Sequence, residues 1–86
     1  MRYFLNKKFK KNFDKLPEPV KRQFTERRKL FESEPYHPLL HNHALTGQYS
    51  DCRSLNINGD VRVIFAYIDD KTVHLIGIGS HSQLYK

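Results

Sequence analysis

The sequence has little of several things that other protein classes depend on. It holds a single cysteine, Cys52, so an internal disulfide framework is excluded and a reducing compartment is favoured. Its longest apolar run, residues 63–68, is far shorter than the ~20 residues of a membrane-spanning helix. Its first eleven residues lack the apolar segment of a signal peptide. These absences predict a soluble, cytoplasmic protein with no membrane partner.

Fingerprints of cofactor and metal binding are also missing. The chain contains no G-x-G-x-x-G, no P-loop and no C-x-x-C. Three histidines, His37, His41 and His43, lie close together in the sequence. Without cysteines or a fixed helical frame, however, they are weak evidence for zinc. A domain of this length buries only ~60–65% of its unfolded surface, which argues against a large internal pocket. We therefore expect neither a cofactor nor a metal site.

What the sequence does hold is aromatic, apolar and basic. With 38% hydrophobic and 13% aromatic residues, the chain is too apolar to be disordered. Its 86 residues predict a single domain over residues 1–86. Residues 1–30 carry 11 basic and 3 acidic side chains, or +8, whereas the other 56 residues carry 4 and 6, or −2. This asymmetry favours a polyanionic partner, either nucleic acid or an acidic protein.

The hydrophobic spacing predicts the element order β-α-α-β-β-β. Residues 2–5 form a strand, residues 7–16 a helix capped by Asn6, and a second helix runs from Pro19 to about Ser33. Residues 36–47 form a loop, three strands follow at residues 52–57, 61–68 and 72–78, and residues 80–86 are a tail. Asn58-Gly59 indicates a type I′ turn with positive φ at both residues. The fold class is α+β, with two N-terminal helices packed on a small antiparallel sheet.

Three short segments carry residues suited to acid–base chemistry. His43 lies in the loop before the strands, Asp60 and Arg62 leave the hairpin two residues apart, and His81 and Tyr85 follow the last strand. The two-residue spacing predicts that Asp60 and Arg62 share a sheet face. A base, a cation and an acid are what metal-free cleavage of a phosphodiester requires. Histidine as a residue type, with a pKa of ~6.5, suits either proton role. Each residue also fits a purely structural role: Asp60 as a turn former, Arg62 as its surface ion-pair partner, and Tyr85 as a packed aromatic residue.

These motifs resemble the RelE superfamily of bacterial toxin–antitoxin toxins, most closely its YafQ-like branch. The resemblance rests on His43-x-Leu45-x-Gly47, on Arg53, on the run from Gly59 to Phe65, and on Gly79-Ser80-His81-x-x-Leu84-Tyr85. It implies a microbial-RNase-like fold and an mRNA endonuclease that attacks the phosphodiester through the 2′-hydroxyl without a metal. It also implies three partners: the 70S ribosome, mRNA and an acidic, DNA-binding antitoxin.

Carried over by position, the resemblance implies roles for individual residues. His81 is the best catalytic candidate, with His43 as its counterpart, Asp60 orienting a histidine and Arg62 holding phosphate. The candidates for substrate binding are Tyr85, Asn56, Arg53, Lys7, Lys10 and Lys11. Two positions depart from the branch: Asn56 replaces a second strand histidine, and Val61 replaces an aromatic residue. These departures bear on activity and codon preference.

Two other functions stay open at this stage. A toxin of the same fold could inhibit gyrase by binding protein, as ParE-type toxins do, without being an enzyme. Alternatively, the chain could be a basic nucleic-acid-binding module without toxicity. DNA-damage signalling on expression would favour the first, and unaffected growth with RNA binding that survives loss of both histidines would favour the second.

Overall fold

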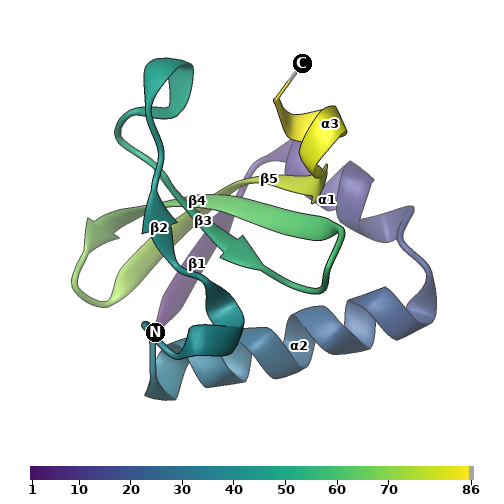
Figure 1. Cartoon of the computed structure of the whole chain (residues 1–86), viewed down its shortest axis with the longest axis horizontal. Helices are drawn as coiled ribbons and strands as arrows, with labels where there is room; N and C mark the ends of the chain where they lie inside the picture. Colours follow the sequence, from purple (N-terminus) through teal and green to yellow (C-terminus); the bar gives the residue numbers. More distant parts are fainter. Residues whose placement is uncertain (86) are drawn as a thin grey trace.

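The computed structural model describes residues 1–85, which form an α+β fold around one sheet (Figure 1). The strands are β1 (Arg2–Leu5), β2 (His43–Ala44), β3 (Arg53–Asn56), β4 (Val61–Asp69) and β5 (Thr72–Ser80). The helices are α1 (Lys7–Asp14), α2 (Glu18–Ser33) and α3 (His81–Leu84), with single 3₁₀ turns at Pro38–Leu40 and Gly47–Tyr49. The α+β class and the predicted element order are confirmed, and β2 and α3 are additions to it. No helix within the described residues is long and apolar enough to cross a membrane.

The sheet is mixed rather than purely antiparallel. Its order is β1-β5-β4-β3-β2, so the strand over residues 61–69 is central, as its nearly continuous apolar sequence predicts. Four strands are antiparallel neighbours, but β1 pairs with β5 in parallel, with Tyr3 opposite Val73. The prediction of an antiparallel sheet was wrong at this edge. The chain leaves β1 through two helices and re-enters the sheet elsewhere, so β1 ends up beside the last strand.

The ends of α1 and α2 follow local chemistry that the sequence shows. Asn6 caps α1, because its Oδ1 accepts the N–H of Phe9 at 2.7 Å. Helix α1 ends at Asp14, two residues before the predicted end at Leu16. Pro19 lies in the first turn of α2, where a missing N–H has no cost, and Glu34 ends that helix just before Pro35. The two helix starts are therefore as predicted.

The hairpin between β3 and β4 forms at the predicted place but with a different turn. Neither Asn58 nor Gly59 has a positive φ, so the type I′ prediction was wrong. Instead Asn58 Oδ1 accepts the N–H groups of Asp60 (2.8 Å) and Val61 (2.7 Å), and Ile57 donates to the carbonyl of Val61. This side-chain cap stabilises a wider turn that extends through Asp60. Strand β4 consequently begins at Val61.

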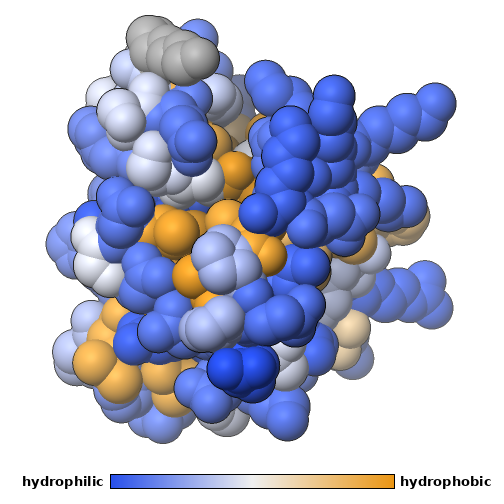
Figure 2. All heavy atoms as spheres, turned by 90° about the vertical axis from the view of Figure 1, so that its right-hand side faces the viewer, coloured by the Kyte–Doolittle hydropathy of each residue, from blue (hydrophilic) through white to orange (hydrophobic). Residues whose placement is uncertain are grey.

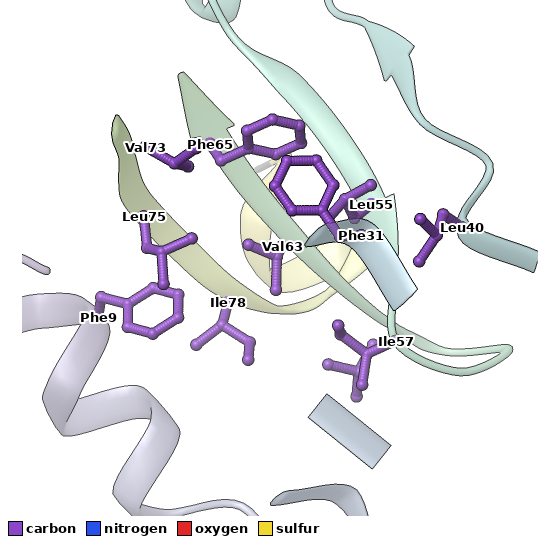
Figure 3. Close-up of a cluster of buried hydrophobic side chains, with 11 residues drawn as sticks. Phe9, Phe31, Leu40, Leu55, Ile57, Val63, Phe65, Val73, Leu75 and Ile78 are labelled. Atoms are coloured by element: carbon purple, nitrogen blue, oxygen red, sulfur yellow. The ribbon is translucent and has the colours of Figure 1, made fainter. Parts of the chain in front are cut away.

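The hydrophobic core lies between the sheet and the pair α1 and α2 (Figure 3). Phe9 and Phe31, from α1 and α2, are at most 2% exposed. Phe31 meets Phe65 edge-on at a ring-centroid distance of 5.3 Å. On β4 the core side chains alternate, with Val63 and Phe65 among them. Arg62 and Ile64 therefore point to the opposite face, the one that α1 and α2 leave free.

Candidate active site

An open groove lies on the sheet face opposite α1 and α2. It has a volume of about 190 Å³, and its lining comes from β2 and the loop after it, from β3, from β4, and from α3 with the residue that follows it. The lining residues are His43, Leu45, Ser54, Arg62, His81 and Tyr85. We call this the histidine groove. It brings together four of the residues predicted for the site, namely His43, Arg62, His81 and Tyr85.

His43 is held in the groove by a short strand and by a backbone carbonyl. It lies opposite Ser54 in the β2–β3 register, so both side chains point to the groove face. Its Nδ1 is 2.8 Å from the carbonyl oxygen of His41, whose φ of 45° is left-handed. A carbonyl only accepts, so Nδ1 of His43 carries the hydrogen. In the neutral ring Nε2 then holds the lone pair, which is the state of a general base.

Arg62 supplies the cation of the histidine groove. One guanidinium nitrogen donates to the carbonyl of Asn58 at 3.1 Å, which anchors the side chain and leaves further N–H donors for a ligand. Asn56 lies directly opposite Arg62 in the β3–β4 register and therefore on the same face. Its Oδ1 is buried and has no hydrogen-bond partner among the described residues. Its predicted part in substrate binding stays a prediction.

His81 begins a helix that the sequence pattern did not reveal, since residues 80–86 were expected to be a tail. Ser80 and Gln83 form a capping box: Ser80 Oγ accepts the N–H of Gln83 at 3.2 Å, and Gln83 Oε1 accepts the N–H of Ser80 at 2.8 Å. Gly79 makes room for this contact, because a Cβ there would lie 2.8 Å from Gln83 Oε1. Lys86, the last residue of the predicted tail, lies outside the described residues.

We expect Ser80→Ala to loosen α3 without unfolding the protein. Loss of an N-cap typically costs about 1 kcal/mol, or roughly a fivefold change in the opening equilibrium of this one helical turn. Amide exchange at Tyr85, whose N–H donates to His81, should accelerate by about that factor. The melting temperature should hardly change. Ser50→Ala in an exposed loop is the control and should leave this exchange rate unchanged. If exchange at Tyr85 were also unchanged in Ser80→Ala, the cap would not be what holds α3.

Two tyrosines support α3 from the side of the loop before β3. The Tyr85 ring lies 4.7 Å from the His81 ring, and the Tyr49 ring meets Tyr85 edge-on at 5.9 Å. The Tyr49 hydroxyl also donates to the carbonyl of Leu84, at 3.4 Å. Tyr85 thus exposes an aromatic surface beside the imidazole of His81, whereas Tyr49 packs behind it.

Asp60 and Arg53, both predicted for the site, do not reach the groove. Asp60 is exposed in the hairpin turn before β4 begins, so it does not share a strand face with Arg62, and no ion pair joins the two within the described residues. The predicted role of Asp60 in orienting a histidine lacks this geometric basis. Arg53 faces the other side of β3, where its Nε donates to Asn42 at 2.7 Å and its guanidinium lies 5.6 Å from the Tyr36 ring.

The predicted lysines and the departing valine also lie elsewhere. Lys7, Lys10 and Lys11 are exposed on α1 and none lines the histidine groove. Val61 is 8% exposed and belongs to the core, so it offers no surface for base stacking. Leu45 and Ser54 do line the groove and were not predicted. The alternation of β3 residues was the signal for Ser54, because a residue two before Asn56 shares its face.

The described side chains offer neither a cluster of metal ligands nor a reactive thiol. The described residues contain no group of three His, Cys, Asp or Glu side chains placed to hold a metal ion. His37 uses its Nδ1 to accept the N–H of Leu39. Burial, and then the charge of Asp51, raises the pKa of the Cys52 thiol, which keeps it in the less reactive protonated form.

Comparison with known families gives a match over the whole chain. The family described as "Bacterial toxin of type II toxin-antitoxin system, YafQ" matches residues 1–86. No curated protein matches the sequence.

Solved structures with the same fold include toxins from three organisms. E. coli YafQ, in its toxin–antitoxin complex with DinJ, shares 16% identity and superposes with a TM-score of 0.81, over 98% of this chain and 96% of that chain. A copper-bound mutant toxin from Helicobacter pylori shares 29% identity with a TM-score of 0.73, over 99% of each chain. RelE in the archaeal RelE–RelB complex from Pyrococcus horikoshii shares 26% identity with a TM-score of 0.71, over 95% of this chain and 96% of that chain.

Proposed function

The chain belongs to the YafQ family of toxins from bacterial type II toxin–antitoxin systems, and from this membership and the histidine groove we propose that it is an endoribonuclease that cleaves mRNA. One observation carries the proposal. Two imidazoles and a guanidinium, from segments far apart in the sequence, line the same open groove. That set supplies the base, the charge stabiliser and the acid for cleavage through the 2′-hydroxyl.

His43 acts as the base in this mechanism. Its Nδ1 hydrogen is committed to the carbonyl of His41, so Nε2 is the atom that accepts a proton. Nε2 removes the proton of a ribose 2′-hydroxyl, and the oxygen attacks the adjacent phosphorus. The same carbonyl then stabilises the imidazolium that forms, because its oxygen faces the charged ring.

Arg62 and His81 complete the reaction. The free N–H groups of Arg62 stabilise the extra negative charge on the phosphoryl oxygens as the pentacovalent species forms. His81 donates a proton to the 5′-oxygen as its bond to phosphorus breaks. The products are a 2′,3′-cyclic phosphate and a free 5′-hydroxyl, so atoms and protons balance. A nucleobase next to the scissile bond stacks on Tyr85.

The partners follow from the charge and from the family. The first 30 residues carry +8, which favours association with ribosomal RNA and cleavage of mRNA on the 70S ribosome, in the cytoplasm. YafQ of E. coli forms a toxin–antitoxin complex with DinJ. We extend this to a cognate antitoxin for the present chain, acidic enough to complement the basic helices and DNA-binding like many regulatory partners of this kind.

Purified protein added to mRNA-programmed ribosomes tests the function. We expect cuts within the mRNA that leave 2′,3′-cyclic phosphate and 5′-hydroxyl ends. Arg62→Ala should lower the cleavage rate by about 10²–10³, the usual loss when one charge-stabilising donor is removed. Lys71→Ala, which removes an exposed cation outside the groove, is the matched control. Intact mRNA together with inhibited gyrase would instead identify a non-enzymatic toxin.

A further inference from the structure

A second hollow lies on the other side of α3 from the histidine groove, between α3, the end of β5 and helix α1. Its volume is about 470 Å³, against about 190 Å³ for the histidine groove. We call it the lysine hollow, after Lys8 and Lys15 in its lining. Figure 2 shows the side of the molecule on which α1 and α3 lie in Figure 1, with an apolar area framed by hydrophilic side chains. None of the residues predicted for RNA binding lines the hollow.

The rim of the lysine hollow is cationic and polar. Lys8 and Asn12 of α1 and its C-cap residue Lys15 follow one another at spacings of four and three residues, so they project on one side of the helix. Both lysines are exposed, and no acidic side chain is among the residues that line the hollow. On the opposite wall, Gln83 uses Oε1 in the capping box, and within the described residues 1–85 its amide N–H groups have no other acceptor and are available to a ligand. An anionic ligand with hydrogen-bonding edges matches this rim.

The floor of the same hollow is apolar and aromatic. Leu16, Ile78 and Leu84 supply the aliphatic surface, and Tyr49 supplies an aromatic wall. A flat, partly apolar ring suits such a floor, whereas inorganic phosphate alone would leave it unfilled. A nucleotide combines both properties, because its base is a flat ring and its phosphate is an anion.

A pair of tyrosines in mutual contact supplies one wall residue to each of the two hollows. Tyr85 lines the histidine groove, Tyr49 lines the lysine hollow, and their rings meet edge-on at 5.9 Å. Helix α3 separates the two, with His81 facing one and Gln83 and Leu84 facing the other. A single RNA strand that passes around α3 would therefore occupy both.

We propose that the lysine hollow is a subsite for a flanking nucleotide of the RNA strand whose scissile phosphate lies in the histidine groove. Lys8 and Lys15 bind phosphate, Asn12 and Gln83 contact the edge of the base, and the apolar floor with Tyr49 receives its face. The inference rests on the proposed function for the identity of the ligand. It predicts that the protein binds long RNA strands more tightly than short ones, because a strand too short to pass around α3 does not make these contacts.

Paired charge-removing variants test the subsite. The test pair is Lys8→Gln with Lys15→Gln, and the control pair is Lys29→Gln with Lys71→Gln, which removes the same charge from exposed positions outside both the hollow and the histidine groove. All four lysines are exposed, so we expect both proteins to fold. The probes are a dinucleotide and an octanucleotide, each also made with a 2′-deoxyribose at the cleavage position so that binding is measured without cleavage.

The test pair should weaken binding of the octanucleotide about tenfold and leave cleavage of the dinucleotide unchanged. The slope of log affinity against log salt should become shallower by about 1.4, because each phosphate contact to a single strand contributes ~0.7. The control pair should change octanucleotide binding less than twofold. In the wild-type protein, the side-chain amide signals of Asn12 and Gln83 should shift in NMR spectra with the octanucleotide and not with the dinucleotide.

Several outcomes would overturn the inference. Equal losses for the two lysine pairs would indicate a diffuse basic surface instead of a subsite. Equal affinity for the short and long RNA would remove the need for a flanking contact. Dependence on Lys8 and Lys15 for an acidic peptide but not for RNA would make the hollow a protein-binding site. By contrast, if wild-type protein leaves mRNA on programmed ribosomes intact but the octanucleotide still binds through these lysines, the subsite stands and the proposed nuclease mechanism fails.

Discussion

Replacing His81 with alanine is expected to lower the rate of RNA cleavage by about 10²–10⁴ and to leave RNA binding nearly unchanged. General acid catalysis typically contributes this much. His81 is exposed at the start of α3, so its loss leaves no cavity in the core. Cleavage of a defined RNA under single-turnover conditions gives the rate. His74→Ala, which removes a histidine from β5 outside the groove, is the matched control.

A sulfur substitution separates the roles of the two histidines. In an RNA whose leaving 5′-oxygen is replaced by sulfur, the leaving group is a thiolate, which departs without a proton because thiols are much more acidic than alcohols. We expect this substrate to restore His81→Ala to within about tenfold of the wild-type rate. His43→Ala should stay slow, since the 2′-hydroxyl still needs a base.

The opposite pattern would contradict the assignment. Recovery of His43→Ala with no recovery of His81→Ala would make His43 the acid and His81 the base. It would also mean that the contact between His43 Nδ1 and the His41 carbonyl does not decide the proton's direction. Full activity of His81→Ala on the ordinary substrate would exclude His81 from the mechanism altogether.

The largest expected effect on stability comes from Phe31→Ala. Phe31 is the residue of α2 that is fully buried, at 2% exposure, and its ring contacts those of Phe65 and Tyr67. Truncating such a side chain costs about 3–5 kcal/mol, because the apolar transfer energy is lost and a cavity stays behind. Small domains have only ~5–15 kcal/mol in total, so the free energy of unfolding should fall by about a fifth or more.

Chemical denaturation followed by circular dichroism measures this loss. Phe4→Ala is the control, because Phe4 is 57% exposed on the edge strand β1 and its removal should change the stability by no more than about 0.5 kcal/mol. Phe31 lies on the face of the sheet away from the histidine groove. Cleavage by the folded fraction of Phe31→Ala should therefore proceed at the wild-type rate. A loss below 1 kcal/mol would mean that α2 can repack without this anchor.

Local patterns predict the structure correctly where one short-range arrangement is favoured. Asn6 caps α1, Pro19 opens α2, and the central strand shows its double-sided burial in a run of apolar residues. The type I′ prediction for the turn at Asn58-Gly59 was wrong because two local arrangements compete there. A type I′ turn needs left-handed φ values, whereas the Asn58 side chain can bind the next amides with ordinary φ, and the latter forms.

The site was predicted only in part, for a physical reason that Asp60 and Arg53 illustrate. The spacing of Asp60 and Arg62 places both on one face only if the strand includes both, and the wider turn begins the strand one residue after Asp60. Arg53 lies one residue before Ser54, so strand alternation turns it away from the groove and toward Asn42 and Tyr36. Helix α3 was missed because four residues are too few for a hydrophobic period.

By itself, the sequence determined the α+β class, most element boundaries and the +8 segment, and it predicted His43, Arg62 and His81 as residues of the site. Each of these follows from side-chain types and spacings over a few residues. Only the tertiary structure decided which residues meet. The register of β2 on β3 turns His43 into the groove, a carbonyl fixes its tautomer, and α3 divides the histidine groove from the lysine hollow. Such contacts join segments far apart in the chain, so strand pairing and helix docking create them, and no local pattern encodes them.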